Sequence, residues 1–280
     1  ITSKTKAILP VHLFGYPADM TPIHYLAKKY DLYIVEDAAC GFGSKIKGTH
    51  VGLFGDTGCF SFHPRKAITT GEGGMITTNN KNLAQKIKIL RDHGAAKTDL
   101  QRHLGAKPYL LADHPEAGYN FRLTDIQAAL GKSQMGRANQ ICDERQKLAE
   151  NYNQSFCSIK NLRLTIPKKE ITHGYQSYVC LFNPDEVNSA IKNKDKDKLI
   201  KICKARNEFM DYLQGEGIST RPGTHAVHML SYYKKSYNLN DNDFISSFAA
   251  NNCSISIPLF HGMSEIEQEY VVEKIINKLL

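Results

Sequence analysis

Strand-like and helix-like segments alternate along the first half of the chain, and this alternation constrains the fold more than any other feature. Residues 19–30 and 82–91 each carry their apolar side chains on one face of a helix. Residues 32–35 form a short continuous apolar run, which is typical of a buried parallel strand. Further strands are expected at residues 6–13, 58–62 and 75–78. The alternation predicts an α/β architecture.

The second half of the chain has a different pattern. Thr124 and Gln127 form a capping-box pattern that opens a long helical connection, reaching to about residue 153. Beyond it we expect strands at residues 175–182 and 254–259 and helices at residues 195–214 and 264–280. The sequence therefore predicts a large domain over residues 1–155 and a smaller α+β domain over residues 156–280.

Composition excludes several classes of protein. No stretch approaches the roughly 20 apolar residues that a membrane span needs. The seven cysteines are scattered without a C-x-x-C pair, which favours a reducing, cytoplasmic setting and argues against a zinc site. The formal net charge is +8, but its Lys-rich stretches lack the interleaved aromatic residues of a nucleic-acid groove. We expect no metal, no membrane and no nucleic-acid partner.

Two sequence features could hold a small ligand. The acidic pair Glu36 and Asp37 ends an apolar strand, and ligands of open α/β sheets bind at the carboxyl ends of strands. An acid there can cap a helix, or it can pair with a pyridinium nitrogen. Lys66 follows Ser61 and His63 in a loop before a cluster of glycines. A lysine amine in such a loop can form a Schiff base with an aldehyde.

A third feature lies immediately before a predicted helix. Asn120 and Arg122 precede the capping box at Thr124, where free N–H groups and the helix dipole favour anions. The alternative is a plain helix entry with a surface arginine.

The order of Asp37, Ser61, Lys66 and Asn120, with their flanking residues, resembles the DegT/StrS family of PLP-dependent sugar aminotransferases. The resemblance extends from residues 10–15 to residues 258–264. It implies a fold-type I PLP-transferase large domain with a mixed, mostly parallel sheet and a smaller α+β C-terminal domain.

The resemblance also implies roles for single residues. Lys66 would be catalytic and bind the 4′-aldehyde of pyridoxal 5′-phosphate (PLP), and Asp37 would pair with the pyridine nitrogen. Ser61 would contact the cofactor phosphate. Asn120 and Arg122 would reach the phosphate of the neighbouring subunit's cofactor, in a homodimer with shared active sites.

By the same resemblance, the reaction is a transamination. Glutamate or glutamine would convert PLP to its amine form (PMP), which would then aminate a nucleotide-linked keto-sugar for polysaccharide or O-antigen biosynthesis. Relatives that dehydrate sugars carry histidine where Lys66 stands, so Lys66 favours amination and His63 would face the substrate. Arg221, His225 and His228 would meet the sugar nucleotide; a turn with incidental histidines is the alternative. The sugar, the keto position and the nucleotide stay open, with GDP-4-keto-6-deoxymannose as one candidate.

The sequence departs from the family pattern in two places. Cys40 stands where relatives have glutamine or histidine in contact with the 3′-oxygen of PLP, and a thiol is a poor hydrogen-bonding partner. The family's N-terminal Gly-Thr phosphate cradle and stacking aromatic residue are also missing. We therefore expect these 280 residues alone to bind PLP weakly and turn over poorly. Two alternatives remain: a catalytically inactive or regulatory PLP-fold protein or fragment, and a nucleotide-binding α/β protein without PLP.

Overall fold

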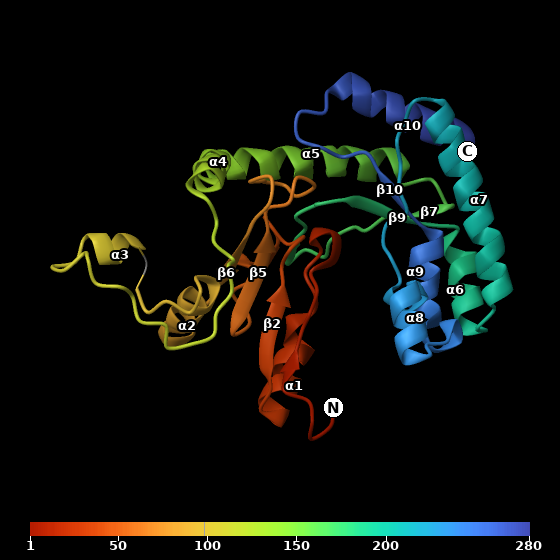
Figure 1. The fold of residues 1–280 in the computed structure, drawn as a ribbon. Coiled ribbons are helices and arrows are strands. Elements are labelled where there is room, and N and C mark those ends of the chain that lie inside the picture. The colour runs from red at the N-terminus through yellow and green to blue at the C-terminus, as the bar shows by residue number, and fades with distance from the viewer. Residues whose placement is uncertain (98) are drawn as a thin grey trace. The chain divides into compact units, whose positions relative to one another are not determined.

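The structure is a computed structural model that describes residues 1–97 and 99–280 (Figure 1). The chain divides into two compact units, Ile1–Asn139 and Gln140–Leu280, and each is described by itself. This division falls earlier than the boundary predicted after residue 155. Helix α5 (Ala138–Phe156) accounts for the difference, because it buries Leu148, Tyr152 and Phe156 in the core of the second unit.

The first unit is built on a four-stranded sheet in the order β1 (Ala7–Ile8), β2 (Tyr33–Asp37), β5 (Thr57–Ser61) and β6 (Gly74–Thr77). β2 runs parallel to both β1 and β5, and β6 runs antiparallel to β5. The predicted mixed, mostly parallel sheet is therefore confirmed. Between β2 and β5 the chain forms a small antiparallel pair, β3 (Lys45–Ile46) and β4 (Thr49–His50).

Helices of the first unit begin where local capping residues specify them. Asp19 caps α1 (Met20–Tyr30), which buries Met20 and Ala27 against Ile34 of β2. Asn80 caps α2 (Lys81–Arg91), and α3 (Asp99–His103) follows it. The predicted capping box is present at Thr124 and opens α4 (Asp125–Met135). A short 3₁₀ turn, η1 (Leu13–Gly15), precedes α1.

The second unit packs helices on a three-stranded antiparallel sheet in the order β10 (Ser254–Ile257), β9 (Tyr178–Phe182) and β7 (Leu162–Arg163). The short strand β8 (Ile171–Thr172) precedes β9. Its other helical elements are α6 (Pro184–Lys192), α7 (Lys196–Gly215), η2 (Val227–Met229), α8 (Ser231–Tyr237), η3 (Asp241–Phe244), α9 (Ile245–Cys253) and α10 (Glu265–Leu279). Figure 1 shows α6, α7 and α9 side by side, where they pack on one another. The described part of the chain contains no helix with the length and apolar character of a membrane span.

Candidate active site

Strand register separates the two acids of the Glu36–Asp37 pair. Asp37 lies opposite Cys59 in the parallel pairing of β2 with β5, and Glu36 lies opposite Gly58. Because successive strand residues point to opposite faces, Asp37, Cys59 and Ser61 share one face of the sheet. Glu36 faces the other side. One acid is thus placed with the predicted phosphate ligand Ser61, and the other is directed away from it.

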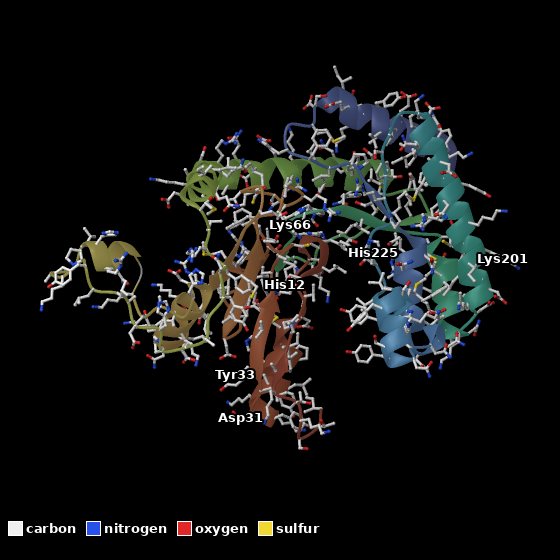
Figure 2. The ribbon with its side chains drawn as sticks, in the orientation of Figure 1. His12, Asp31, Tyr33, Lys66, Lys201 and His225 are labelled. Atoms are coloured by element: carbon white, nitrogen blue, oxygen red, sulfur yellow. The ribbon has the colours of Figure 1, made fainter. Side chains whose placement is uncertain are left out.

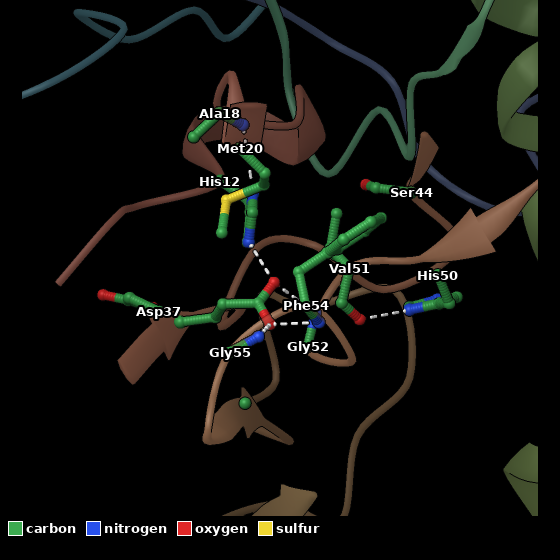
Figure 3. Close-up of polar contacts among 12 residues, drawn as sticks. His12, Ala18, Met20, Asp37, Ser44, His50, Val51, Gly52, Phe54 and Gly55 are labelled. Carbon is green, nitrogen blue, oxygen red and sulfur yellow. Dashed lines mark hydrogen bonds and ion pairs between the residues drawn. The ribbon is translucent and has the colours of Figure 1, made fainter. Parts of the chain in front are cut away.

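The Glu36 carboxylate is completely buried and accepts four hydrogen bonds (Figure 3). Its Oε1 accepts from the N–H groups of Phe54 at 2.7 Å and Gly55 at 2.6 Å, and its Oε2 accepts from Gly52 N–H at 2.7 Å and from His12 Nε2 at 2.9 Å. Burial raises the pKa of Glu36, but these hydrogen bonds outweigh it and hold that pKa below its usual value. Glu36 therefore anchors the turn over residues 52–55 to β2.

The tautomer of His12 follows from its two partners. The N–H of Ala18 donates to His12 Nδ1 at 3.1 Å, so this nitrogen carries no proton. The ring proton therefore lies on Nε2 and is donated to Glu36. His12 is completely buried and links the segment before α1 to the carboxylate of β2. The role of His12 is therefore structural. His12 lies in residues 10–15 of the family resemblance, which implied no separate role for it.

Asp37 is available to a ligand. Its backbone is held on one edge, where Asp37 N–H donates to Pro10 O at 2.8 Å and His12 N–H donates to Asp37 O at 3.0 Å. Its Oδ1 accepts from Ala39 N–H at 3.0 Å. The other carboxylate oxygen accepts no hydrogen bond from the part of the chain that the structure describes. A half-buried carboxylate with one open oxygen can hold a proton on a bound ring nitrogen.

Lys66 lies in a tight turn that follows β5. Its N–H donates to His63 O at 2.9 Å, and His63 N–H donates to Ser61 Oγ at 3.3 Å. The Lys66 amine, labelled in Figure 2, lies 3.1 Å from the Cys40 sulfur. Cys40 comes three residues after Asp37, so this contact brings the ends of β2 and β5 together. The predicted amine, thiol, carboxylate and hydroxyl thus gather at one edge of the sheet.

The side chains of Asn120, Arg122 and His63 have other partners or neighbours. Arg122 Nη1 donates to Asp92 Oδ1 at 3.0 Å, and Asn120 forms a backbone bridge with Asp92. His63 Nε2 lies 4.0 Å from Glu72 Oε1, and its side chain is 38% exposed. Among the described residues, no hydrogen bond joins these three side chains to Asp37 or Lys66. Their predicted roles toward a second subunit or a substrate remain predictions.

The predicted substrate loop of the second unit lies along β10. Arg221 pairs with Ser256 through two backbone hydrogen bonds of 3.3 and 2.7 Å, and Gly223 N–H donates to Ser254 Oγ at 3.1 Å. Gly223 is needed there, because a Cβ atom would lie 2.6 Å from Val179 Cγ1. The side chains of Arg221 and His225 are exposed on this loop, and His225 is labelled in Figure 2.

His228 is placed differently from the other two residues of that loop. Its side chain is 4% exposed, its ring stacks on Phe244 with centroids 5.0 Å apart, and its Nε2 lies 3.8 Å from Asp241 Oδ1. The ring of His228 is thus buried, unlike the side chains of Arg221 and His225. The predicted contacts of all three residues with the sugar nucleotide stay predictions.

Comparison with known proteins provides independent information. The model of the DegT/DnrJ/EryC1/StrS aminotransferase family matches residues 1–276. An uncharacterized protein of Methanocaldococcus jannaschii is 35% identical over an alignment of 281 positions that covers 99% of this chain and 69% of that protein. A GDP-perosamine synthase of Escherichia coli O157:H7 is 33% identical over 98% of this chain and 66% of its own length. The chain thus spans about two thirds of the length of the curated relatives it matches.

Solved structures show the same fold. A putative sugar aminotransferase from Streptococcus pneumoniae in its PLP form superposes with a TM-score of 0.82 at 24% identity, covering 100% of this chain and 70% of that one. Its PMP form superposes with a TM-score of 0.84. The predicted fold class is confirmed.

Proposed function

Because this chain belongs to the DegT/DnrJ/EryC1/StrS aminotransferase family, we propose that it transfers an amino group to a nucleotide-linked keto-sugar with PLP as cofactor. One observation carries the proposal. The Lys66 amine contacts Cys40 at the end of β2, next to the sheet face that Asp37 and Ser61 share.

The donor set of this edge fits PLP group by group. PLP presents an aldehyde, a pyridine nitrogen and a phosphate, and the sheet edge offers an amine, a carboxylate and a hydroxyl. Lys66 would bind the aldehyde, and Asp37 would hold the proton on the ring nitrogen with its open carboxylate oxygen. Ser61 Oγ accepts from His63 N–H, so its own proton is free to be donated to a phosphate oxygen. Cys40 would lie beside the ring.

The chain's residues would then act as follows. PLP, when bound, supplies the electron sink for removal of a proton next to an amino group. Lys66 would hold the aldehyde of the cofactor, and with an amino donor bound its free amine would act as the base that takes the proton from Cα of the donor. Asp37 would keep the ring nitrogen protonated throughout.

Similarity to GDP-perosamine synthases supports a nucleotide-linked keto-sugar as amino acceptor. Glutamate or glutamine would be the donor. Arg221 and His225 would bind the diphosphate, whose charge suits an arginine fork. Asn120 and Arg122 would reach the cofactor phosphate of a second copy in a homodimer. The product would enter polysaccharide or O-antigen biosynthesis in the cytoplasm.

A second candidate is a PLP-fold protein without transaminase activity. The observation that favours it is Cys40, whose sulfur accepts from the Lys66 amine at the position where we expected an oxygen or nitrogen ligand for the cofactor ring. Such a protein would bind PLP at Lys66 but would not exchange amino groups.

A cofactor titration tests the proposal. PLP is added to the purified chain, the visible spectrum is recorded, and the protein is reduced with borohydride and mapped by peptide mass spectrometry. We expect label on Lys66 and none in Lys66→Ala. Glutamate should convert the bound cofactor to PMP. Label at another lysine would contradict the proposed site, whereas label at Lys66 without conversion would support the inactive candidate.

A further inference from the structure

We propose that Cys40 and Lys66 form an oxidative cross-link, a direct sulfur–nitrogen bond that blocks the amine intended for the cofactor. The inference starts from the 3.1 Å contact between Cys40 Sγ and Lys66 Nζ. Formation of the bond needs only these two side chains and a peroxide. Only its effect on PLP binding rests on the proposed function.

Backbone hydrogen bonds hold both partners in place. Cys40 lies in the turn after β2, where Gly41 N–H donates to Ala38 O at 2.8 Å, and Ala38 N–H donates to Cys59 O of β5 at 2.9 Å. Lys66 lies in the turn after β5 that its own N–H closes on His63 O. Since β2 and β5 are paired parallel strands, the two turns emerge at the same edge. The pairing of β2 with β5 therefore places the turns that carry Cys40 and Lys66 next to each other.

Three of the other cysteines provide a contrast in reactivity. Burial raises the pKa of Cys180 and of Cys253 to about 12, which keeps these thiols protonated and unreactive. Burial, together with the charge of Asp37, also raises the pKa of Cys59. Cys40 is only partly buried, so a small oxidant can reach its sulfur. Its nearest nucleophile is already in contact.

The chemistry proceeds in two balanced steps. The Cys40 sulfur attacks one oxygen of hydrogen peroxide, the O–O bond breaks, and the thiol proton leaves with the other oxygen as water, so that a sulfenic acid and one water result. The neutral Lys66 amine then attacks the sulfur, the S–O bond breaks, and a second water leaves with a proton from nitrogen. Sulfenic acids are known to condense with nitrogen in this way. Sulfur is oxidised, peroxide is reduced, and a thiol reductant reverses the bond.

The PLP aldehyde and the Cys40 sulfur would therefore compete for the nitrogen of Lys66. Lys66 cannot bind an aldehyde while it is bonded to Cys40, so the oxidised chain should lose its capacity for PLP. A bound cofactor should in turn withhold the amine from the sulfur.

The test treats the cofactor-free chain with hydrogen peroxide and maps its peptides by mass spectrometry. We expect a linked pair of peptides containing Cys40 and Lys66, lighter by two hydrogen atoms than their sum and separated again by dithiothreitol. Lys66→Arg should lose the linked pair while its Cys40 becomes trappable by dimedone, a sulfenic-acid reagent. Cys59→Ser, the control on the neighbouring strand, should keep the link.

Two results would overturn the proposal. One is dimedone capture of Cys40 in the unaltered chain without any linked pair; the other is a linked pair that carries an additional oxygen. PLP added before peroxide should suppress the link several-fold. If the link forms but PLP gives no protection, the cross-link stands and the proposed function is the part in doubt.

Discussion

Glu36 and Asp37 are adjacent residues with opposite surroundings. The residue pattern predicted an acidic pair at a strand end without distinguishing the two acids, and only the family resemblance singled out Asp37. The structure assigns the structural role to Glu36, whose carboxylate meets four donors, and leaves Asp37 with one. The residue pattern alone could not make this choice, because the donors come from the turn over residues 52–55 and from His12, which are distant in the chain.

We predict that Glu36→Gln lowers the free energy of unfolding by about 3 kcal/mol, because an amide would present a donor to buried N–H groups. Asp37→Asn should change it by less than about 1 kcal/mol, since the asparagine oxygen can still accept from Ala39 N–H. Urea unfolding of the two variants measures the difference. Equal losses would contradict the assignment of Glu36 as the anchor.

The stability that Glu36 contributes should depend on pH. Its pKa is lowered in the folded protein, so the unfolded chain binds this proton more tightly. The contribution is therefore complete above the ordinary glutamate value of about 4.3 and is lost as the pH falls through the folded pKa. We expect the stability gap between the unaltered chain and Glu36→Gln to narrow below about pH 4. Urea unfolding across pH 3–7 checks this, and a constant gap would exclude Glu36 as the source.

At the scale of elements, the predictions succeeded where the signal was local. The capping box predicted at Thr124 is present, and the helix expected over residues 264–280 begins with a capping box at Ser264. Helix α9 was not predicted, and it begins at Ile245 without a side-chain cap from the preceding Phe244. Its position depends on packing against α6 and α7, which a single sequence does not reveal. Helix α6 was missed despite a local signal, a proline in its first turn followed by two acids.

The turn that contains Gly52 requires a glycine because its backbone lies very close to β5. The φ of Gly52 is +82°, and a Cβ atom would lie 2.6 Å from the Phe60 ring on β5. Gly48 has nearly the same φ, +81°, with nothing within 4 Å of that position. Gly48→Ala should therefore cost about 1 kcal/mol through backbone strain alone. Gly52→Ala should cost about 2 kcal/mol more through overpacking, as measured by thermal and urea unfolding.

A double variant is the control for the comparison of Gly52 with Gly48. Replacing the Phe60 ring by a smaller side chain in Gly52→Ala/Phe60→Leu should restore part of the additional stability that Gly52→Ala loses, because the clash is with the ring. If both alanine variants lose the same stability, contact with Phe60 does not determine the need for glycine at position 52.

At the scale of the whole chain, the two units have unequal cores. The second unit buries a continuous apolar cluster that includes Tyr152, Phe156, Leu213 and Ile255. The main buried apolar cluster of the first unit consists of Met20, Ala27 and Ile34 with a few partly buried neighbours. The sequence predicted two domains but not this inequality, because burial depends on which strands and helices meet.

The inequality predicts how the chain exchanges its amide hydrogens. Amides of β9 and β10 should exchange slowest, because opening these strands exposes the larger apolar core. Amides of β2 and β5 should exchange faster, because opening those strands costs less free energy.

Binding of PLP should change this pattern locally. A ligand that binds only the folded site adds about 2.7 kcal/mol to the stability of the folded state at one hundred times its dissociation constant. PLP should therefore slow exchange around residues 37–40 and 61–66 and leave β9 and β10 unchanged. Native-state exchange followed by mass spectrometry measures both effects. Slower exchange in β9 and β10 instead would indicate that the cofactor does not bind at Lys66.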